Sequence, residues 1–224
     1  MYAVKIGLIG AGRIGGNLAR RWTEAGHDVL ISFSRDPDRL RDTARTVGAT
    51  AGSVAEAAAF GDVVVVAVPW RTLDDVARQA GSLWGKILID TTNPYGPGGL
   101  VSLSATAAET NRARFPGVAY AKAFNTLTAQ FQADAVERPK ELRPAMFFVA
   151  EKEAVSTVEQ LIEPVGFVPV ILGGPEDAEL LEAPRREGSV YGEEYRPDDA
   201  RRIATEYYAG GDAAALAAQL KQPG

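Results

Sequence analysis

The sequence predicts an α/β protein with a doubly wound, mostly parallel sheet of about eight strands and a short helical C-terminal arm. Two observations indicate this fold. Short apolar runs alternate with amphipathic segments from Ile6 to Leu172, and from Gly173 the chain becomes charged and rich in glycine and proline. Such alternation is typical of parallel sheets with helices on both faces. We expect one domain at residues 1–174 and an arm or cap at residues 175–224.

The first strand leads into a glycine-rich turn. The segment 5–16 reads KIGLIGAGRIGG and predicts a strand, a tight turn and a helix that ends at Gly26. Gly10 allows the turn, Gly12 lets the backbone approach a pyrophosphate, and Gly15 lets the helix pack closely on the strand. Amides at the helix N-terminus then face the anion. The motif predicts a Rossmann dinucleotide site, with a purely structural turn as the alternative.

The end of the second strand indicates which dinucleotide binds. Ser34 and Arg35 follow the apolar run Val29–Phe33, where an NAD-binding protein has an acidic residue. A hydroxyl and a guanidinium suit a 2′-phosphate, so we expect NADP(H) in preference to NAD(H). Alternatively, Arg35 is an exposed charge before a helix that Asp36 caps.

The other elements follow from the same alternation. The β-branched run Val63–Val68 is typical of a central parallel strand that is buried on both faces. Further strands are expected at Thr50, Lys86–Asp90, Ala119–Phe124, Met146–Ala150 and Phe167–Leu172. Helices are expected at 37–47, after a capping box at Ser53–Glu56, from Thr72, from Ser104 to Phe115, at Lys152–Glu163, at Pro197–Tyr208 and at Asp212–Leu220, and loops at Thr91–Gly99 and Val136–Pro144.

Three segments at strand ends are candidates for ligand binding. Pro69-Trp70, Thr91–Gly99 and Asn125–Leu127 each follow a predicted strand directly. Ligands of open α/β sheets bind outside the carboxyl ends of the strands, so we expect these segments to lie on the cofactor side. Trp70 either contacts the cofactor or packs between sheet and helix.

Composition excludes several classes of protein. A net charge of −5 and a pI near 5.1 leave no basic stripe for a nucleic acid. The chain has no cysteine and one histidine, His27 at a helix-to-strand turn, so we expect a structural histidine and no metal site. No apolar run approaches the ~20 residues needed to cross a bilayer, and the first predicted strand begins close to Met1. We therefore expect no signal peptide, no membrane partner and a cytoplasmic location.

The sequence lacks a familiar acid–base constellation. It has no Tyr-x-x-x-Lys motif and no histidine near the later strands. Hydride transfer between two ring systems needs mainly alignment and exclusion of water. The pattern therefore favours transfer from a nicotinamide to a flavin or deazaflavin over ketone reduction.

The sequence resembles the F-420-dependent NADP oxidoreductases, which exchange hydride between NADP(H) and the deazaflavin coenzyme F-420. The resemblance covers about Lys5 to Leu181 and rests on the glycine motif, Ser34-Arg35, Val68-Pro69-Trp70, Thr92-Asn93-Pro94 and Lys122–Leu127. It implies that Gly10 to Ile14 hold the pyrophosphate, with Gly10, Gly12, Arg13, Ile14 and Gly15 as cofactor-binding residues of this turn. It further implies that the 2′-phosphate lies at Ser34 and Arg35, the nicotinamide ribose at Val68, Pro69 and Trp70, and the ring near Asn93, Ala123 and Asn125. It also implies F-420 as the small-molecule co-substrate and a homodimer.

Two other functions stay open. The protein could be an NADPH-dependent reductase of another small acceptor, such as a flavin, imine or quinone, with Lys122, Tyr95 or a tyrosine of the arm as the proton donor. It could also be a non-catalytic NADP(H)-binding protein.

Overall fold

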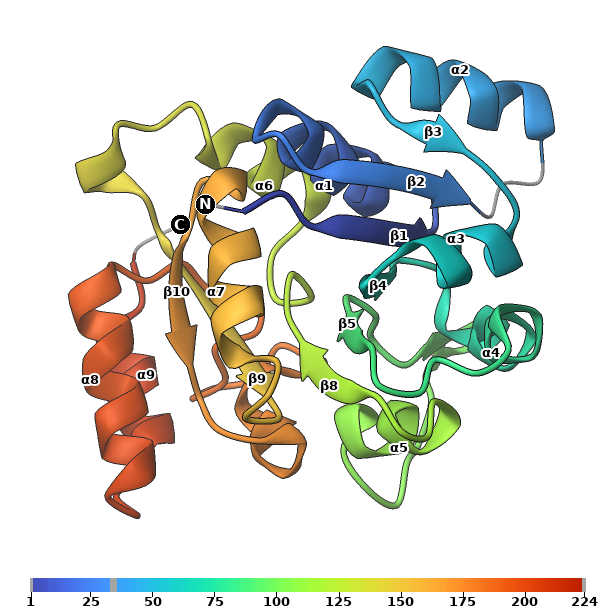
Figure 1. Ribbon diagram of the computed structural model, residues 1–224. Coiled ribbons are helices and arrows are strands. Elements are labelled where there is room, and N and C mark those ends of the chain that lie inside the picture. Colours follow the sequence, from blue (N-terminus) through green and yellow to red (C-terminus); the bar gives the residue numbers. More distant parts are fainter. Residues whose placement is uncertain (1, 33–35, 223–224) are drawn as a thin grey trace.

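The computed structural model describes residues 2–32 and 36–222. The main strands are β1 (Lys5–Ile9), β2 (Asp28–Ser32), β3 (Thr50–Ala51), β4 (Val63–Val66), β5 (Ile87–Asp90), β8 (Ala119–Lys122), β9 (Ala145–Ala150) and β10 (Val168–Ile171). They form an eight-stranded sheet in the order β10-β9-β8-β5-β4-β1-β2-β3 (Figure 1). The predicted number of strands and the doubly wound fold are therefore confirmed.

The sheet is parallel except at one junction. β8 and β9 are antiparallel, with Ala121 opposite Ala150, whereas β9 and β10 are parallel to each other. Apolar alternation does not encode strand direction, so the sequence could not predict that the last two strands run opposite to the others. The carboxyl ends of β1, β4, β5 and β8 still meet at one edge, where parallel sheets bind their ligands.

Each face of the sheet carries its own apolar core. In β4, Val63 and Val65 belong to one core while Val64 and Val66 belong to the other, as expected for a strand that is buried on both faces. Helices α1 (Arg13–Glu24), α2 (Pro37–Val47), α6 (Ala129–Ala135) and α7 (Val155–Ile162) supply the first core. Helices α3 (Val54–Phe60), α4 (Leu73–Ala80), α5 (Ala107–Arg114), α8 (Pro197–Tyr208) and α9 (Ala213–Leu220) supply the second.

Short elements connect these layers. They are the 3₁₀ turns η1 (Trp70–Thr72), η2 (Lys140–Leu142), η3 (Glu163–Val165) and η4 (Pro175–Leu181), and a hairpin of β6 (Tyr95–Gly96) and β7 (Gly99–Leu100). The predicted polar loop Thr91–Gly99 contains this short hairpin, whose second strand extends to Leu100.

The start of α5 also differs from the prediction. Thr106, not Ser104, caps this helix: its hydroxyl accepts from the Glu109 amide, while the Glu109 carboxylate accepts from the Thr106 amide. Such a reciprocal pair satisfies two amides that have no partner within the helix. The equivalent box predicted at Ser53–Glu56 is confirmed.

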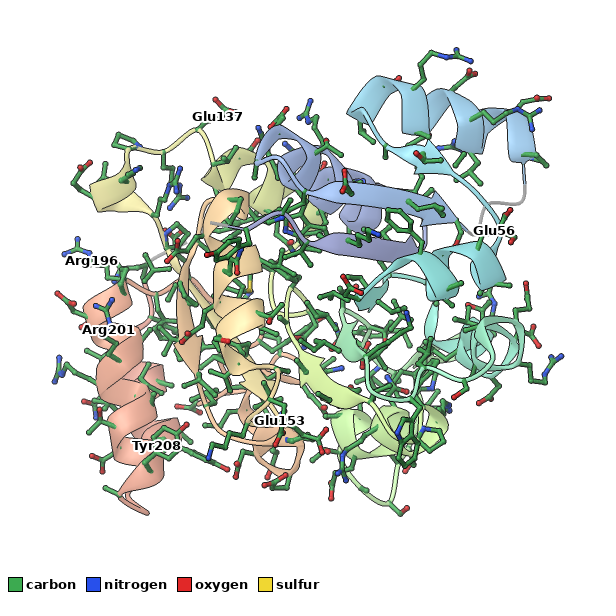
Figure 2. All side chains as sticks on the ribbon, in the orientation of Figure 1. Glu56, Glu137, Glu153, Arg196, Arg201 and Tyr208 are labelled. Carbon is green, nitrogen blue, oxygen red and sulfur yellow. The ribbon has the colours of Figure 1, made fainter. Side chains whose placement is uncertain are left out.

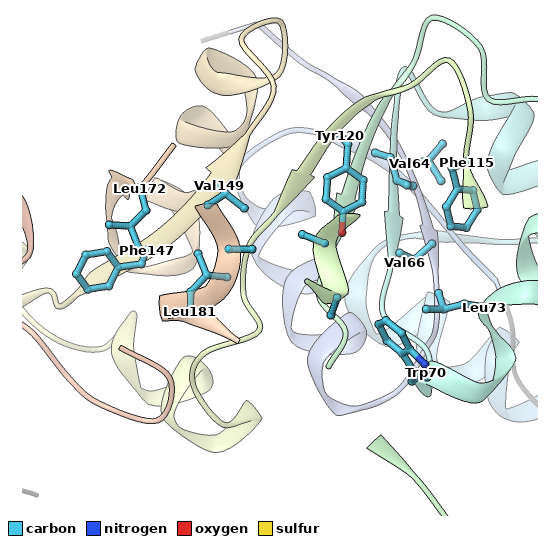
Figure 3. Packing of buried hydrophobic residues seen from close by; sticks show 14 of the residues in the cluster. Val64, Val66, Trp70, Leu73, Phe115, Tyr120, Phe147, Val149, Leu172 and Leu181 are labelled. Atoms are coloured by element: carbon cyan, nitrogen blue, oxygen red, sulfur yellow. The ribbon is translucent and has the colours of Figure 1, made fainter. Parts of the chain in front are cut away.

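The C-terminal arm shares the second core. Leu181 lies near Val149 and Leu172 (Figure 3). The Tyr195 ring packs edge-on against Phe147 at 5.5 Å between centroids, and its hydroxyl donates to the Ala217 carbonyl at 3.1 Å. Charged side chains such as Arg201 lie on the outer surface of α8 (Figure 2). The arm is therefore fixed to the sheet by apolar contacts.

Candidate functional site

The turn between β1 and α1 has the close packing that glycine alone allows. Gly10 has a φ of +125°, and a Cβ there would lie 2.3 Å from the Ala67 carbonyl oxygen. A Cβ on Gly15 would lie 1.8 Å from the Gly10 carbonyl oxygen, so helix and strand touch directly. At Gly12 no described atom outside the adjoining residues and the backbone of the helix lies within 4 Å of that position, which leaves open space beside the helix N-terminus.

The N-terminus of α1 suits an anion. It has no side-chain cap and no acidic residue in its first turn, so its amides are free of carboxylate partners from that turn. Exposed amides and the positive end of the helix dipole together favour a phosphate. Arg13 opens the helix and is exposed, whereas Ile14 is half-buried and faces the adjoining cavity.

A cavity of about 450 Å³ lies over this turn. Its lining comes from the glycine turn, the start of α2 and the end of β4: Gly10, Ala11, Gly12, Asp36, Arg39, Thr43, Ala67, Val68, Pro69 and Thr72. Ser34 and Arg35, the predicted 2′-phosphate residues, lie outside the described residues. Sequence reasoning missed Arg39, although a cation in the first turn of the helix after the second strand was a usable signal.

A second cavity of about 580 Å³ adjoins the first, and Ala67, Val68 and Pro69 line both. The remaining lining comes from the ends of β5 and β8, from the hairpin and from the arm: Ile14, Trp70, Thr91, Thr92, Asn93, Tyr95, Phe124, Asn125, Thr126, Leu127, Thr128, Ala129, Arg185, Tyr191 and Gly192. All three predicted ligand-binding segments therefore meet in one cleft.

Two asparagines join the ends of β5 and β8. Asn93 Nδ2 donates to the Asn125 carbonyl at 2.9 Å, and Asn125 Nδ2 donates to the Leu181 carbonyl at 2.8 Å. Asn125 Oδ1 is buried and has no hydrogen-bond partner among the described residues. A buried acceptor without a donor suits a ligand N–H group. Ala123, which was predicted near the ring, is fully buried and does not line either cavity.

The backbone at Phe124 is strained. Its φ is +60°, a rare conformation for an aromatic residue. The ring packs edge-on against Trp22 at 6.0 Å, and the carbonyl accepts from Gln132 Nε2 at 2.9 Å. Such strain persists where the surroundings fix it, and it is common at ligand sites. These contacts hold the turn that places Asn125 in the cleft.

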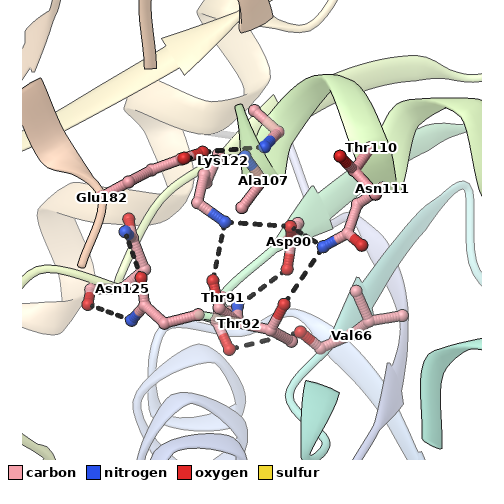
Figure 4. A network of polar contacts seen from close by, with 12 residues as sticks. Val66, Asp90, Thr91, Thr92, Ala107, Thr110, Asn111, Lys122, Asn125 and Glu182 are labelled. Atoms are coloured by element: carbon pink, nitrogen blue, oxygen red, sulfur yellow. Dashed lines mark hydrogen bonds and ion pairs between the residues drawn. The ribbon is translucent and has the colours of Figure 1, made fainter. Parts of the chain in front are cut away.

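A buried polar network supports the cleft from below (Figure 4). The Asp90 carboxylate accepts from Lys122 Nζ at 3.1 Å, from the Tyr120 hydroxyl at 2.6 Å and from Asn111 Nδ2 at 2.6 Å. Lys122 also donates to the Thr92 carbonyl at 2.6 Å, directly beneath the polar loop after β5. The network thus fixes that loop to two strands and a helix.

The network determines the charge of its members. Burial acts to raise the pKa of Asp90, but the Lys122 charge and the hydrogen bonds from Tyr120, Asn111 and the Thr92 amide together lower it, so the carboxylate stays ionised. Burial and the neighbouring Asp90 raise the pKa of Tyr120 far above its ordinary value. Lys122 is fully buried and lines neither cavity, so of the proton donors considered, the geometry favours Tyr95 and a tyrosine of the arm over Lys122.

Trp70 combines the two roles that were considered for it. It is 6% exposed and belongs to the second apolar core, yet it lines the second cavity. The Arg114 guanidinium lies 4.9 Å from the centroid of its ring, a cation–π contact that fixes its orientation.

Two tyrosines form the outer wall of the second cavity. The hydroxyl groups of Tyr95 and Tyr191 lie 3.4 Å apart. Burial, with help from the Tyr95 hydrogen bond, raises the pKa of Tyr191, which keeps its phenol neutral. The Tyr195 hydroxyl is bonded to α9 instead, so Tyr191 is the tyrosine of the arm that faces the cleft.

His27 lies away from the cleft. Its Nδ1 accepts from the Val4 amide at 3.1 Å, and burial lowers its pKa, although the charge of Asp28 opposes this. Within residues 2–32 and 36–222, no three His, Asp or Glu side chains gather as a metal site. None of the helices described in those ranges has the length and apolar character to span a bilayer.

The fold and cleft define a doubly wound α/β protein with a cleft at the carboxyl edge of its sheet, where such sheets bind their ligands. Residues 5–94 match the family model described as NADP oxidoreductase, coenzyme F-420-dependent. This match supports the predicted resemblance to the family. Metalloreductase STEAP3 from Rattus norvegicus is 30% identical over 181 residues, which make up 81% of this chain and 36% of that protein. The chain thus spans only 36% of the length of this curated relative.

Solved structures share the architecture. A hypothetical protein from Sinorhizobium meliloti matches with a TM-score of 0.73 and 29% identity, over 83% of this chain and 92% of its own. A candidate F-420-dependent NADP reductase from Arthrobacter sp. FB24 matches with a TM-score of 0.68 and 24% identity, over 80% of this chain and 90% of its own. The second match supports the fold alone.

Proposed function

We propose that this protein transfers hydride between NADP(H), held over the glycine turn, and a deazaflavin of the F-420 type, held in the second cavity. The observation that carries the proposal is the continuity of the two cavities through Ala67, Val68 and Pro69. A nicotinamide that extends from the first cavity past these residues reaches the second. Two planar groups can then face each other inside one cleft.

The residues present fit a bound NADP(H). The open space at Gly12 and the uncapped amides of α1 suit the pyrophosphate, and Arg39 suits an additional phosphate at the ribose. Asn125 Oδ1 suits a carboxamide N–H group. When bound, the reduced nicotinamide supplies a hydride, so that NADPH, the oxidised deazaflavin and one proton become NADP⁺ and the reduced deazaflavin.

The second cavity is suited to alignment more than to proton transfer. Among its described lining residues there is no histidine, aspartate, glutamate or lysine. Its walls combine apolar and aromatic side chains with threonine and asparagine side chains. This composition fits ring-to-ring hydride transfer, in which the protein contributes mainly position.

A spectrophotometric assay tests this proposal. Purified protein is mixed with NADPH and oxidised F-420, with FMN as a parallel acceptor and NADH as a parallel donor. We expect rapid bleaching of F-420 with NADPH and little with NADH. Binding of NADPH, observed as a change in its fluorescence, without bleaching of F-420 would reject the deazaflavin and retain the cofactor.

The tyrosine pair supports a second candidate function, the reduction of an imine or quinone with a phenol as proton donor. Tyr95 and Tyr191 bring two hydroxyl groups to the cavity wall. This candidate predicts a pH-dependent rate that collapses in Tyr191→Phe or Tyr95→Phe. The deazaflavin reaction predicts modest effects of both substitutions, because neither phenol takes part in the hydride step.

A further inference from the structure

The second cavity contains a single charged side chain. Among its described lining residues, Arg185 alone is charged, and it lies with Trp70, Tyr95 and Tyr191, three of the four aromatic residues in that lining. A guanidinium in an otherwise uncharged, largely apolar cleft attracts an anion, and it presents several donors in a planar fork. The three rings offer flat surfaces to a planar ligand. The cavity is therefore suited to a planar aromatic molecule that carries negative charge.

Arg185 is held at the cavity by its neighbours in the arm. A Cβ on Gly192 would lie 3.3 Å from Arg185 Cδ, so the stem of the arginine crosses the bare backbone of this glycine. The Gly192 amide donates to the Thr126 carbonyl at 2.8 Å, which attaches the arm to the loop after β8. The position of Arg185 is thus set by the same loop that carries Asn125.

The guanidinium is paired with a carboxylate that has a second cation nearby. It donates to the Glu193 carboxylate from Nε at 2.9 Å and from Nη2 at 3.0 Å, and its side chain is 64% exposed. Glu193 is only 9% exposed, but it also lies 3.7 Å from Lys221 Nζ. If Arg185 turns towards a ligand, Glu193 keeps a cation and no buried carboxylate is left unpaired.

We infer that Arg185 binds an anionic group of the hydride acceptor and so selects negatively charged planar acceptors over neutral ones. This inference rests on the proposed function, because it takes the second cavity as the place of the acceptor. It goes further by assigning the selection to a residue of the C-terminal arm. Phosphate, carboxylate and ring phenolate groups share the required chemistry.

FMN and riboflavin provide a direct test, because they share one ring system and differ by a phosphate. The full-length protein is saturated with NADP⁺ and titrated with each flavin by fluorescence. We expect the wild-type protein to bind FMN at least about tenfold more tightly than riboflavin, the size of one charge-assisted contact. Arg185→Ala should remove this preference, Arg185→Lys should retain part of it, and NADPH affinity should not change in either variant.

Arg201→Ala is the matched control. Arg201 is 57% exposed, pairs with Asp198 and lies on α8, outside the cavity (Figure 2). Its replacement should leave the ratio of FMN to riboflavin affinity unchanged. Equal affinity of the wild-type protein for both flavins, no binding of either, or a preference that survives Arg185→Ala would overturn the inference. If F-420 is not reduced but the Arg185-dependent preference for FMN persists, F-420 is rejected as the acceptor. The assignment of Arg185 as an anion-binding residue is then retained.

Discussion

Lys122 Nζ lies 3.1 Å from Asp90 Oδ2, and both side chains are fully buried beneath the cleft. The two residues come from the ends of neighbouring strands, β8 and β5. Since Lys122 also donates to the Thr92 carbonyl, the pair fixes the loop that presents Asn93 to the second cavity. The pair thus positions the cleft without contacting a ligand.

Removing one partner of this pair should destabilise the fold strongly. Lys122→Met leaves the Asp90 carboxylate buried without its cation, so we expect the free energy of unfolding to fall by about 3–5 kcal/mol. The double variant with Asp90→Asn should lose less than the sum of the two single losses, because no uncompensated charge remains. Urea denaturation measures all three variants. Single losses below about 1 kcal/mol would show that the pair contributes little.

Gly12 and Gly16 allow a comparison of binding with stability. Among the described residues, nothing beyond the neighbouring backbone lies within 4 Å of a Cβ at either position, so alanine should be tolerated in the free protein at both. Only Gly12 lines the first cavity. We expect Gly12→Ala to weaken NADPH binding about tenfold or more by occupying space beside the phosphate, and Gly16→Ala to have no such effect. Fluorescence titration measures the affinities, and thermal unfolding confirms the folding of both variants. Equal NADPH affinity in the two variants would argue against a pyrophosphate at Gly12.

The local features of the cleft could be predicted from the sequence because nearby residues determine them. The turn at Gly10 and the close approach at Gly15 follow from spacing within one strand and one helix. Trp70 and Asn125 were placed at the correct edge of the sheet, since a parallel strand ends where its ligands bind.

The remaining features depend on contacts between distant segments. Tyr95 and Tyr191 meet across 96 positions of the sequence, and the partnership of Lys122 with Asp90 depends on strand order. Neither relationship leaves a periodic signal in the chain. The burial of Lys122 depends on β8 and β5 being neighbours, which the sequence does not reveal. Lys122 was therefore considered as a proton donor.

His27 should make the stability of the protein depend on pH. Its pKa in the folded protein is lowered from 6.5 by burial, so below that pH the unfolded chain binds a proton that the folded protein does not. Stability is therefore retained above the unfolded pKa and is lost as the pH falls through the folded pKa. His27→Asn, which can keep an acceptor for the Val4 amide, should reduce the loss in unfolding free energy between pH 7 and pH 5. Identical pH profiles for the wild-type protein and the variant would contradict a buried, neutral His27.

Arg39 should contribute to the selection of NADPH over NADH. It lines the first cavity, and a charge-assisted hydrogen bond contributes about 1.5–3 kcal/mol. We expect Arg39→Ala and Arg35→Ala each to weaken NADPH binding by about tenfold or more while NADH binding changes little. Arg45→Ala is the control, because Arg45 lies on the same helix, pairs with Asp42 and does not line the cavity. Equal losses of affinity for NADPH and NADH would indicate that these arginines contact a group that both dinucleotides share, such as the pyrophosphate. That result would remove the basis for NADP(H) selectivity.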